Sequence, residues 1–152
     1  MPVIWEPYLE IPNIASDADI RQVEEVLGVR FPADYRAVLQ AHQGQMPEPS
    51  DFKVGRGNDV LSCLLHATPS VRDNQYHLLS GYEIIRDYLP PTVFPIAETP
   101  GGNKICLDYR TSSDAPVIIH WNHELDEDQA ITLLAPSFTD FLAKLYDLDH
   151  SV

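Results

Sequence analysis

The amino-acid sequence predicts an α+β fold: a single domain in which helices pack on a mainly antiparallel sheet of about five or six strands. Three observations favour this class. Apolar residues recur at helical spacing between 16 and 44 and again after 137, residues alternate in character from 104 to 109, and an apolar run at 117–121 follows a polar turn. The chain has 152 residues, which is enough to bury a core without disulfides or metals.

The N-terminal third predicts an extended arm followed by two helices. Residues 1–15 are punctuated by prolines, so we expect an arm anchored by Trp5 and Tyr8 and a domain that covers 16–152. Ser16 is a predicted N-cap for a helix that ends at Gly28. Pro32 suits the start of a second helix, because its missing N–H would be unbonded there anyway. That helix carries Tyr35 on its apolar face and ends before Gly44.

The middle of the chain has weaker signals. We expect a loop over 45–58 with a short strand at 52–54, and a buried strand over the apolar run 60–67. A weak helical pattern covers 70–88, with a break predicted at Gly81 and with Ile84, Ile85 and Tyr88 pointing inward. A further strand is expected at 93–97.

A β-hairpin is the clearest prediction. Gly101 and Gly102 permit a sharp turn into a strand that places Ile105 and Leu107 on one face and Cys106 and Asp108 on the other. Residues 111–116 supply turn chemistry, and the apolar run 117–121, ending in Trp121, predicts a central strand covered on both sides. A short strand at 130–134 and a helix capped by Ser137 complete the chain.

The charge of the chain restricts its partners. The formal net charge is −13, since 23 acidic residues oppose 10 lysines and arginines. Such a surface repels nucleic acid and anionic membranes, and the sequence contains neither a secretion signal nor an apolar run long enough to span a bilayer. We therefore expect a cytoplasmic protein whose two cysteines, Cys63 and Cys106, are buried and reduced.

Acidic residues are concentrated in one predicted loop. Glu124, Asp126, Glu127 and Asp128 crowd together after the 117–121 strand. Acidity can serve solubility alone, but charge repulsion within so short a segment lowers stability unless a cation compensates the charge. We predict this loop as the contact point for a basic protein.

Catalytic and metal sites have less support. The segment HWNHE at 120–124 lacks the HExxH order of a zinc helix, and strand geometry points His120 and His123 to opposite faces. Asp108 with His120 is the best available acid/base pair, and Gly55-Arg56-Gly57 is more typical of a hairpin tip than of a phosphate loop. We expect no cofactor and no metal.

The ordered set of motifs resembles the SMI1/KNR4 family, the first group of the SUKH superfamily. The resemblance runs from about residue 16 to 147 and is weakest over 45–92. The matching positions are Leu27-Gly28, Pro32, Asp34-Tyr35, Gly44, Gly101-Gly102, Ile105 to Asp108, Val117, Trp121, His123-Glu124, Ser137-Phe138 and Phe141-Leu142.

This resemblance implies a binding domain without catalytic residues. Bacterial members look like immunity proteins that neutralise toxin domains, often nucleases, whereas eukaryotic relatives act as regulatory scaffolds. The short chain favours the bacterial type, with a cognate toxin or other basic protein as partner. A regulatory scaffold is the alternative, and a small hydrolase that uses Asp108 and His120 is a third hypothesis.

Overall fold

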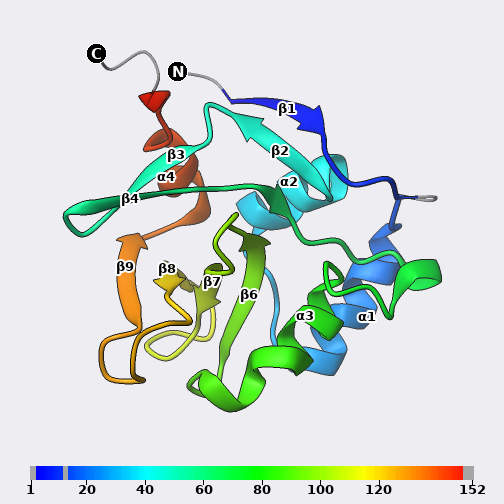
Figure 1. Ribbon diagram of the computed structural model, residues 1–152. Coiled ribbons are helices and arrows are strands. Elements are labelled where there is room, and N and C mark those ends of the chain that lie inside the picture. The colour runs from blue at the N-terminus through cyan, green and yellow to red at the C-terminus, as the bar shows by residue number, and fades with distance from the viewer. Residues whose placement is uncertain (1–2, 12–13, 149–152) are drawn as a thin grey trace.

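The computed structural model describes residues 3–11 and 14–148 and confirms the α+β class (Figure 1). A five-stranded antiparallel sheet has the strand order β5-β6-β7-β8-β9, and two further two-stranded sheets pair β1 with β2 and β3 with β4. The strands are β1 (Ile4–Pro7), β2 (Gln45–Glu48), β3 (Asp51–Val54), β4 (Gly57–Val60), β5 (Cys63–Leu64), β6 (Val93–Glu98), β7 (Lys104–Asp108), β8 (Val117–Trp121) and β9 (Ile131–Ala135).

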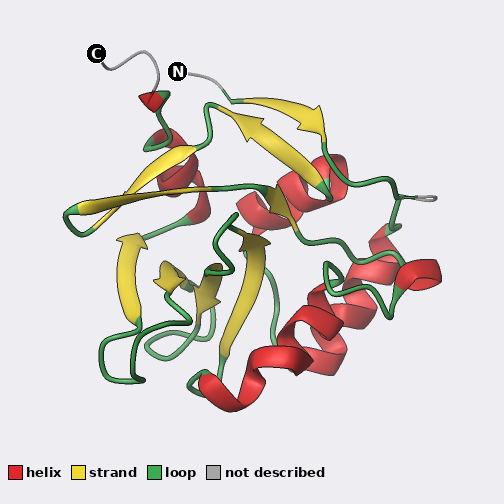
Figure 2. Cartoon of the chain, in the orientation of Figure 1, coloured by secondary structure: helices red, strands yellow, loops and turns green. Residues whose placement is uncertain are grey.

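Within the described residues, four α-helices pack beside these strands (Figure 2). They are α1 (Asp17–Leu27), α2 (Ala33–His42), α3 (Leu78–Ile85) and α4 (Phe138–Ala143), with the 3-10 turns η1 (Pro69–Val71) and η2 (Arg86–Tyr88). No helix within residues 3–11 and 14–148 is long and apolar enough to span a membrane.

Local capping explains why the first helix begins and ends where the sequence predicts. The Ser16 hydroxyl accepts a hydrogen bond from the Asp19 N–H at 3.2 Å, and the Asp19 carboxylate accepts one from the Ser16 N–H at 2.9 Å. This capping box satisfies two donors that the helix itself leaves free. Gly28 ends the helix in the left-handed region with φ of 75°. Ser137 caps α4 through its side chain alone, with its hydroxyl accepting a hydrogen bond from the Asp140 N–H at 3.1 Å.

Gly44 joins three parts of the chain. Its φ is 76°, and a Cβ on this residue would lie 2.4 Å from Cδ1 of Ile11, so neither the backbone angle nor the space admits a side chain. The Gly44 N–H donates to the Leu64 carbonyl at 3.0 Å, and its own carbonyl accepts from the Leu9 N–H at 2.9 Å. The glycine therefore ties the N-terminal segment to the end of α2 and to β5.

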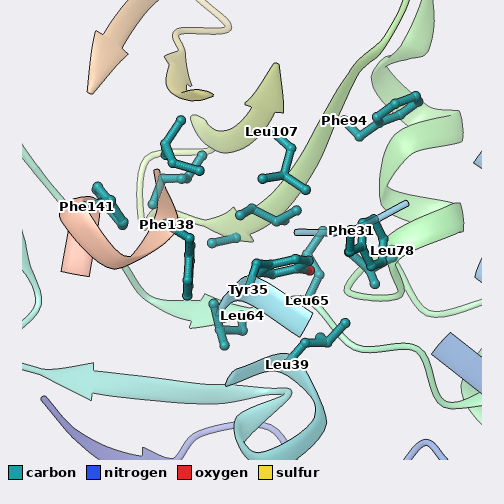
Figure 3. Close-up of a cluster of buried hydrophobic side chains, with 14 of the residues drawn as sticks. Phe31, Tyr35, Leu39, Leu64, Leu65, Leu78, Phe94, Leu107, Phe138 and Phe141 are labelled. Carbon is teal, nitrogen blue, oxygen red and sulfur yellow. The ribbon is translucent and has the colours of Figure 1, made fainter. Parts of the chain in front are cut away.

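The main core lies against one face of the five-stranded sheet. Tyr35 of α2 is fully buried, with its ring at right angles to those of Phe31 and Phe138 at centroid distances of 5.1 and 5.2 Å (Figure 3). Phe52 of β3 packs edge-on against Phe141 of α4 at 5.3 Å. Aromatic pairs in this geometry add stabilisation beyond the area they bury.

A second, smaller core covers part of the opposite face. The strand side chains alternate, so Cys106 and Ile119, which are cross-strand partners, point away from the main core. They pack with residues of the segment that leads from α3 to β6. The buried members of this cluster are Ile85, Leu89, Val93, Cys106, Ile119, Trp121 and Ala130.

Most predicted elements are confirmed, but the middle of the chain differs. The predicted strand at 60–67 forms ladder pairs only at Cys63 and Leu64, because the backbone of His66 bonds to Tyr76 and Leu78 instead of continuing along the sheet. Strands β2 and β4 were not predicted. β2 pairs with the distant β1 and β4 with the adjacent β3, and neither β2 nor β4 has an apolar alternation of its own.

The predicted break at Gly81 is wrong, since Gly81 lies inside α3. A Cβ there would lie 3.0 Å from the Gln75 carbonyl oxygen and 3.3 Å from a Leu65 methyl group, so the glycine permits close packing of the helix. The inward orientation predicted for Ile84 and Tyr88 is also wrong, as each is 63% exposed, whereas Ile85 is buried as expected.

Removal of the Tyr35 hydroxyl is expected to stabilise the protein. This hydroxyl is buried and has no hydrogen-bond partner among the described residues, and burial of an unpaired polar group costs free energy. Tyr35→Phe should therefore raise the free energy of unfolding in urea by about 1 kcal/mol. Tyr109→Phe is the matched control, because the Tyr109 hydroxyl donates to the Arg30 carbonyl at 2.7 Å and its removal should lower stability. Equal losses of stability in both variants would contradict this account.

The stability of the fold is expected to fall in mild acid because of His66 and His77. Their rings meet edge-on at 5.2 Å, and each Nδ1 accepts a backbone hydrogen bond, from Thr68 at 3.2 Å and from Leu79 at 3.0 Å. Burial lowers the pKa of both to about 4, with mutual repulsion adding to the effect at His77.

The unfolded chain therefore binds more protons than the folded chain between pH 6.5 and 4. Each histidine should lower the free energy of unfolding by about 1 to 2 kcal/mol as the pH falls from 6.5 to 5. Urea titrations across this range measure the loss. His77→Asn keeps a capping acceptor for α3 but cannot titrate, so it should reduce the slope. A flat profile in the unsubstituted protein would rule out the effect.

Candidate protein-binding site

The acidic segment predicted as the contact point is the loop between β8 and β9. Its two ends are joined by a hydrogen bond of 2.9 Å from the Asn122 N–H to the Ala130 carbonyl. Inside it, the N–H of Leu125 donates to the Asn122 carbonyl at 3.2 Å and that of Gln129 to the Asp126 carbonyl at 2.9 Å. The loop is therefore a set of bonded turns, and its side chains project outward.

The four acidic side chains of this loop are all exposed. Within the described part of the chain, no lysine or arginine forms an ion pair with Glu124, Asp126, Glu127 or Asp128. The imidazole of His123 lies beside them, with its Nε2 3.8 Å from the Glu124 carboxylate. Like charges at adjacent positions repel, and water screens them only in part. The loop thus presents uncompensated negative charge.

His123 fixes the base of the loop to the turn before β7. Its Nε2 hydrogen-bonds with the Gly101 carbonyl at 2.8 Å, and its backbone N–H donates to Oδ1 of Asn103 at 3.2 Å. Gly102 lies against the imidazole: its φ is 91°, and a Cβ there would come within 3.2 Å of the His123 Nε2. The two glycines singled out in the sequence therefore adjoin the acidic loop.

The other motif positions have structural roles away from the acidic loop. Gly28 and Pro32 are the residues that end α1 and precede α2, and Tyr35 is in the main core. Asp108 accepts hydrogen bonds from the Arg110 guanidinium at 2.8 to 3.1 Å, and these bonds are the main reason that the Arg110 pKa is raised. Trp121 is 6% exposed and belongs to the second core.

The structure does not bring Asp108 and His120 together. Asp108 is opposite Val117 in the β7–β8 ladder, whereas His120 is opposite Ile105. Three residues along a strand correspond to about 10 Å and place the two side chains on opposite faces. The acid/base pair considered from the sequence is therefore not formed.

His120 instead bonds to Asp59 of β4, a partner 61 positions away that sequence reasoning missed. The His120 Nε2 lies 2.8 Å from Oδ2 of Asp59, which also accepts from Asn103 at 3.3 Å. Burial raises the pKa of Asp59, but the bonds from His120, the Val60 N–H and Asn103 outweigh it, so the pKa lies below its usual value. His120 is only 3% exposed, and this pair holds the β3–β4 hairpin against the five-stranded sheet.

Nucleophile and metal chemistry find little support among the described residues. Both cysteines are free and buried, as predicted, and burial raises the pKa of Cys63 to about 12, which disfavours the reactive thiolate. No group of three His, Cys, Asp or Glu side chains within residues 3–11 and 14–148 is arranged to hold a metal ion. Gly55, Arg56 and Gly57 lie at the tip of the β3–β4 hairpin.

Comparison with known proteins agrees with this architecture. The SMI1 / KNR4 family (SUKH-1) matches residues 14–144. The chain is also 27% identical over 154 residues to the SPbeta prophage-derived uncharacterized protein YokK of Bacillus subtilis (strain 168), a match that covers 90% of this chain and 77% of the relative. A match to this family supports a protein-interaction or immunity-type domain. Since the family match spans most of the chain, this protein belongs to the SMI1/KNR4 family (SUKH-1).

Proposed function

We propose that this protein is a non-catalytic cytoplasmic immunity protein that binds and neutralises a cognate basic toxin, with a nuclease as the favoured class. The observation that carries the proposal is the β8–β9 loop, where four acidic side chains within residues 124–128 are exposed and have no lysine or arginine partner among the described residues. A partner that supplies cations would relieve this repulsion and gain affinity from it.

The charge of the whole chain supports the same partner class. A nuclease must be basic where it holds phosphate, and a protein of net charge −13 is attracted to such a surface at long range. Electrostatic attraction of this kind raises the association rate and weakens as salt is added. The matched relative comes from a bacterium, which favours the immunity type over a regulatory scaffold.

Capture from native lysate tests the partner class directly. The tagged full-length chain should retain one basic protein at low salt and release it at high salt, with mass spectrometry as the readout. If the captured protein cleaves nucleic acid and one equivalent of this chain stops the cleavage, the toxin class is established. A collection of housekeeping or regulatory proteins would favour the scaffold instead.

Gene deletion separates the two functions in the cell. An immunity gene is expected to be dispensable once the toxin gene is removed, because the protein then has nothing to neutralise. A regulatory scaffold would give a phenotype that persists after removal of any toxin gene. Growth of single- and double-deletion strains measures the difference.

Neutralisation of the loop should slow capture of the basic partner. The variant Glu124→Gln, Asp126→Asn, Glu127→Gln, Asp128→Asn is expected to associate about tenfold more slowly at low salt and to show a flatter dependence of rate on salt. Surface plasmon resonance over a series of salt concentrations gives both quantities, and circular dichroism checks that the fold survives.

The control removes the same number of charges from another part of the surface. Glu6, Glu10, Glu25 and Glu48 are exposed acidic residues of the N-terminal half without ion pairs among the described residues. Their replacement by glutamine should slow association much less. If both variants slow association equally, overall charge and not this loop attracts the partner.

A further inference from the structure

A groove of about 520 Å³ runs beside the acidic loop. One wall comes from the segment that leaves η2, the other from the end of the acidic loop and the start of β9, and Trp121 at the end of β8 lies between them. Both walls lie at the same end of the sheet, away from β1 and β2 (Figure 1). The groove therefore borders the surface proposed for partner binding and shares Glu127 and Asp128 with it.

The floor of the groove is apolar and already packed. Leu89 and Trp121 are 8% and 6% exposed, and both belong to the second core together with Val93 and Ile119. Side chains held in this way cannot collapse into the open space above them. A ligand that enters finds a preformed apolar surface and loses little free energy to reorganisation.

The rim differs from the floor. Tyr88 is 63% exposed on one side, and Glu127 and Asp128 are exposed on the other. Arg86 of η2 has its guanidinium 6.0 Å from the centre of the Tyr82 ring, and it forms no ion pair with the loop acids among the described residues. The two carboxylates at the rim are thus left without a cation from η2.

An apolar floor, an aromatic ring and two carboxylates together suit one kind of side chain. Arginine has an aliphatic stem that lies along apolar surface, a planar head that stacks on aromatic rings, and a fork of N–H donors that matches carboxylate oxygens. We infer that this groove receives an arginine side chain from a segment of the basic partner, with its stem over Leu89 and Trp121 and its guanidinium between Tyr88 and the carboxylates of Glu127 and Asp128.

This inference rests on the proposed function for the identity of the partner as a basic protein. Other occupants fit less well. An anionic group would be repelled by the rim, and a wholly apolar side chain would remove water from two carboxylates without replacing it. Lysine satisfies the charge, but its compact ammonium neither stacks nor bonds in two places at once, so we expect it to bind more weakly.

Peptide titration of the purified full-length protein tests the groove without any toxin. The probe is the capped pentapeptide acetyl-Gly-Ala-Arg-Ala-Gly-amide, followed by NMR of the isotope-labelled protein. Its matched controls carry lysine or citrulline in place of arginine, and citrulline keeps the shape of arginine without its charge. The arginine peptide should shift the Trp121 indole signal and the amide signals of 88–91 and 127–131 in a saturable manner. The Trp5 indole, which stacks on His42 at 5.2 Å, should not move.

Two double variants separate the groove from the loop. Glu127→Gln with Asp128→Asn should weaken binding of the arginine peptide about three- to fivefold, the range of an exposed ion pair. Glu124→Gln with Asp126→Asn removes the same charge from the same loop outside the groove and should change binding less than twofold. Tyr88→Ala should also weaken binding. If the two double variants weaken binding equally, general attraction to the loop explains the binding, and the inferred arginine site in the groove is overturned.

Other outcomes are equally decisive. Binding of the citrulline peptide as tight as that of the arginine peptide, or shifts confined to other regions, would overturn the inference. Shifts that depend on protein concentration without peptide would show that a second copy of the chain covers the groove. If the titration fails while lysate capture succeeds, the groove is wrong and the acidic surface stands. If capture fails while the titration succeeds, the groove stands without the immunity function.

Discussion

The fold depends on covering the sheet on both faces. Strands β6, β7 and β8 are buried throughout most of their length, so apolar side chains of alternating direction must find partners above and below. One face is covered by the main core, in which residues of α1, α2, α3, α4 and β3 pack together and the Tyr35 ring contacts those of Phe31 and Phe138. The other face is covered by a smaller cluster, to which Ile85 and Leu89 of the segment 85–91 contribute. This thinner cover leaves Leu89 and Trp121 as the apolar floor of the groove near the acidic loop.

The parts of the fold that the sequence predicts are those specified by local chemistry. Ser16 and Ser137 cap helices, Gly28 ends one, and the alternation at 104–109 sets a strand, because each signal acts within a few residues. The errors lie where contacts between distant parts of the chain determine the local structure. Gly81 is read locally as a break, yet its small size serves the approach of α3 to Leu65 and Gln75. Similarly, β2 owes its strand conformation to β1, which precedes it by about forty residues.

The candidate site likewise contains parts that local sequence signals predict and parts that they do not. Four acidic residues within a five-residue stretch after a predicted strand indicate an exposed loop on composition alone, and the structure places all four at the surface. No local signal pairs His120 with Asp59 or brings Tyr88 beside Trp121, because these residues meet only after the sheet has formed. Asp108 and His120 are on neighbouring strands as expected, but the register of the ladder keeps them apart. Register is set by burial of whole faces, which a single pair of polar residues does not reveal.

The base of the β8–β9 loop has a consequence for how recognition can change. The bond between Asn122 and Ala130, together with the contact of His123 with Gly101, closes the loop through residues that do not themselves project toward a partner. The side chains at 124–128 can therefore be replaced, lengthened or reversed in charge while the sheet beneath them stays unchanged. Exchange of a few of these exposed side chains would therefore change the charged surface without a matching set of changes in the core.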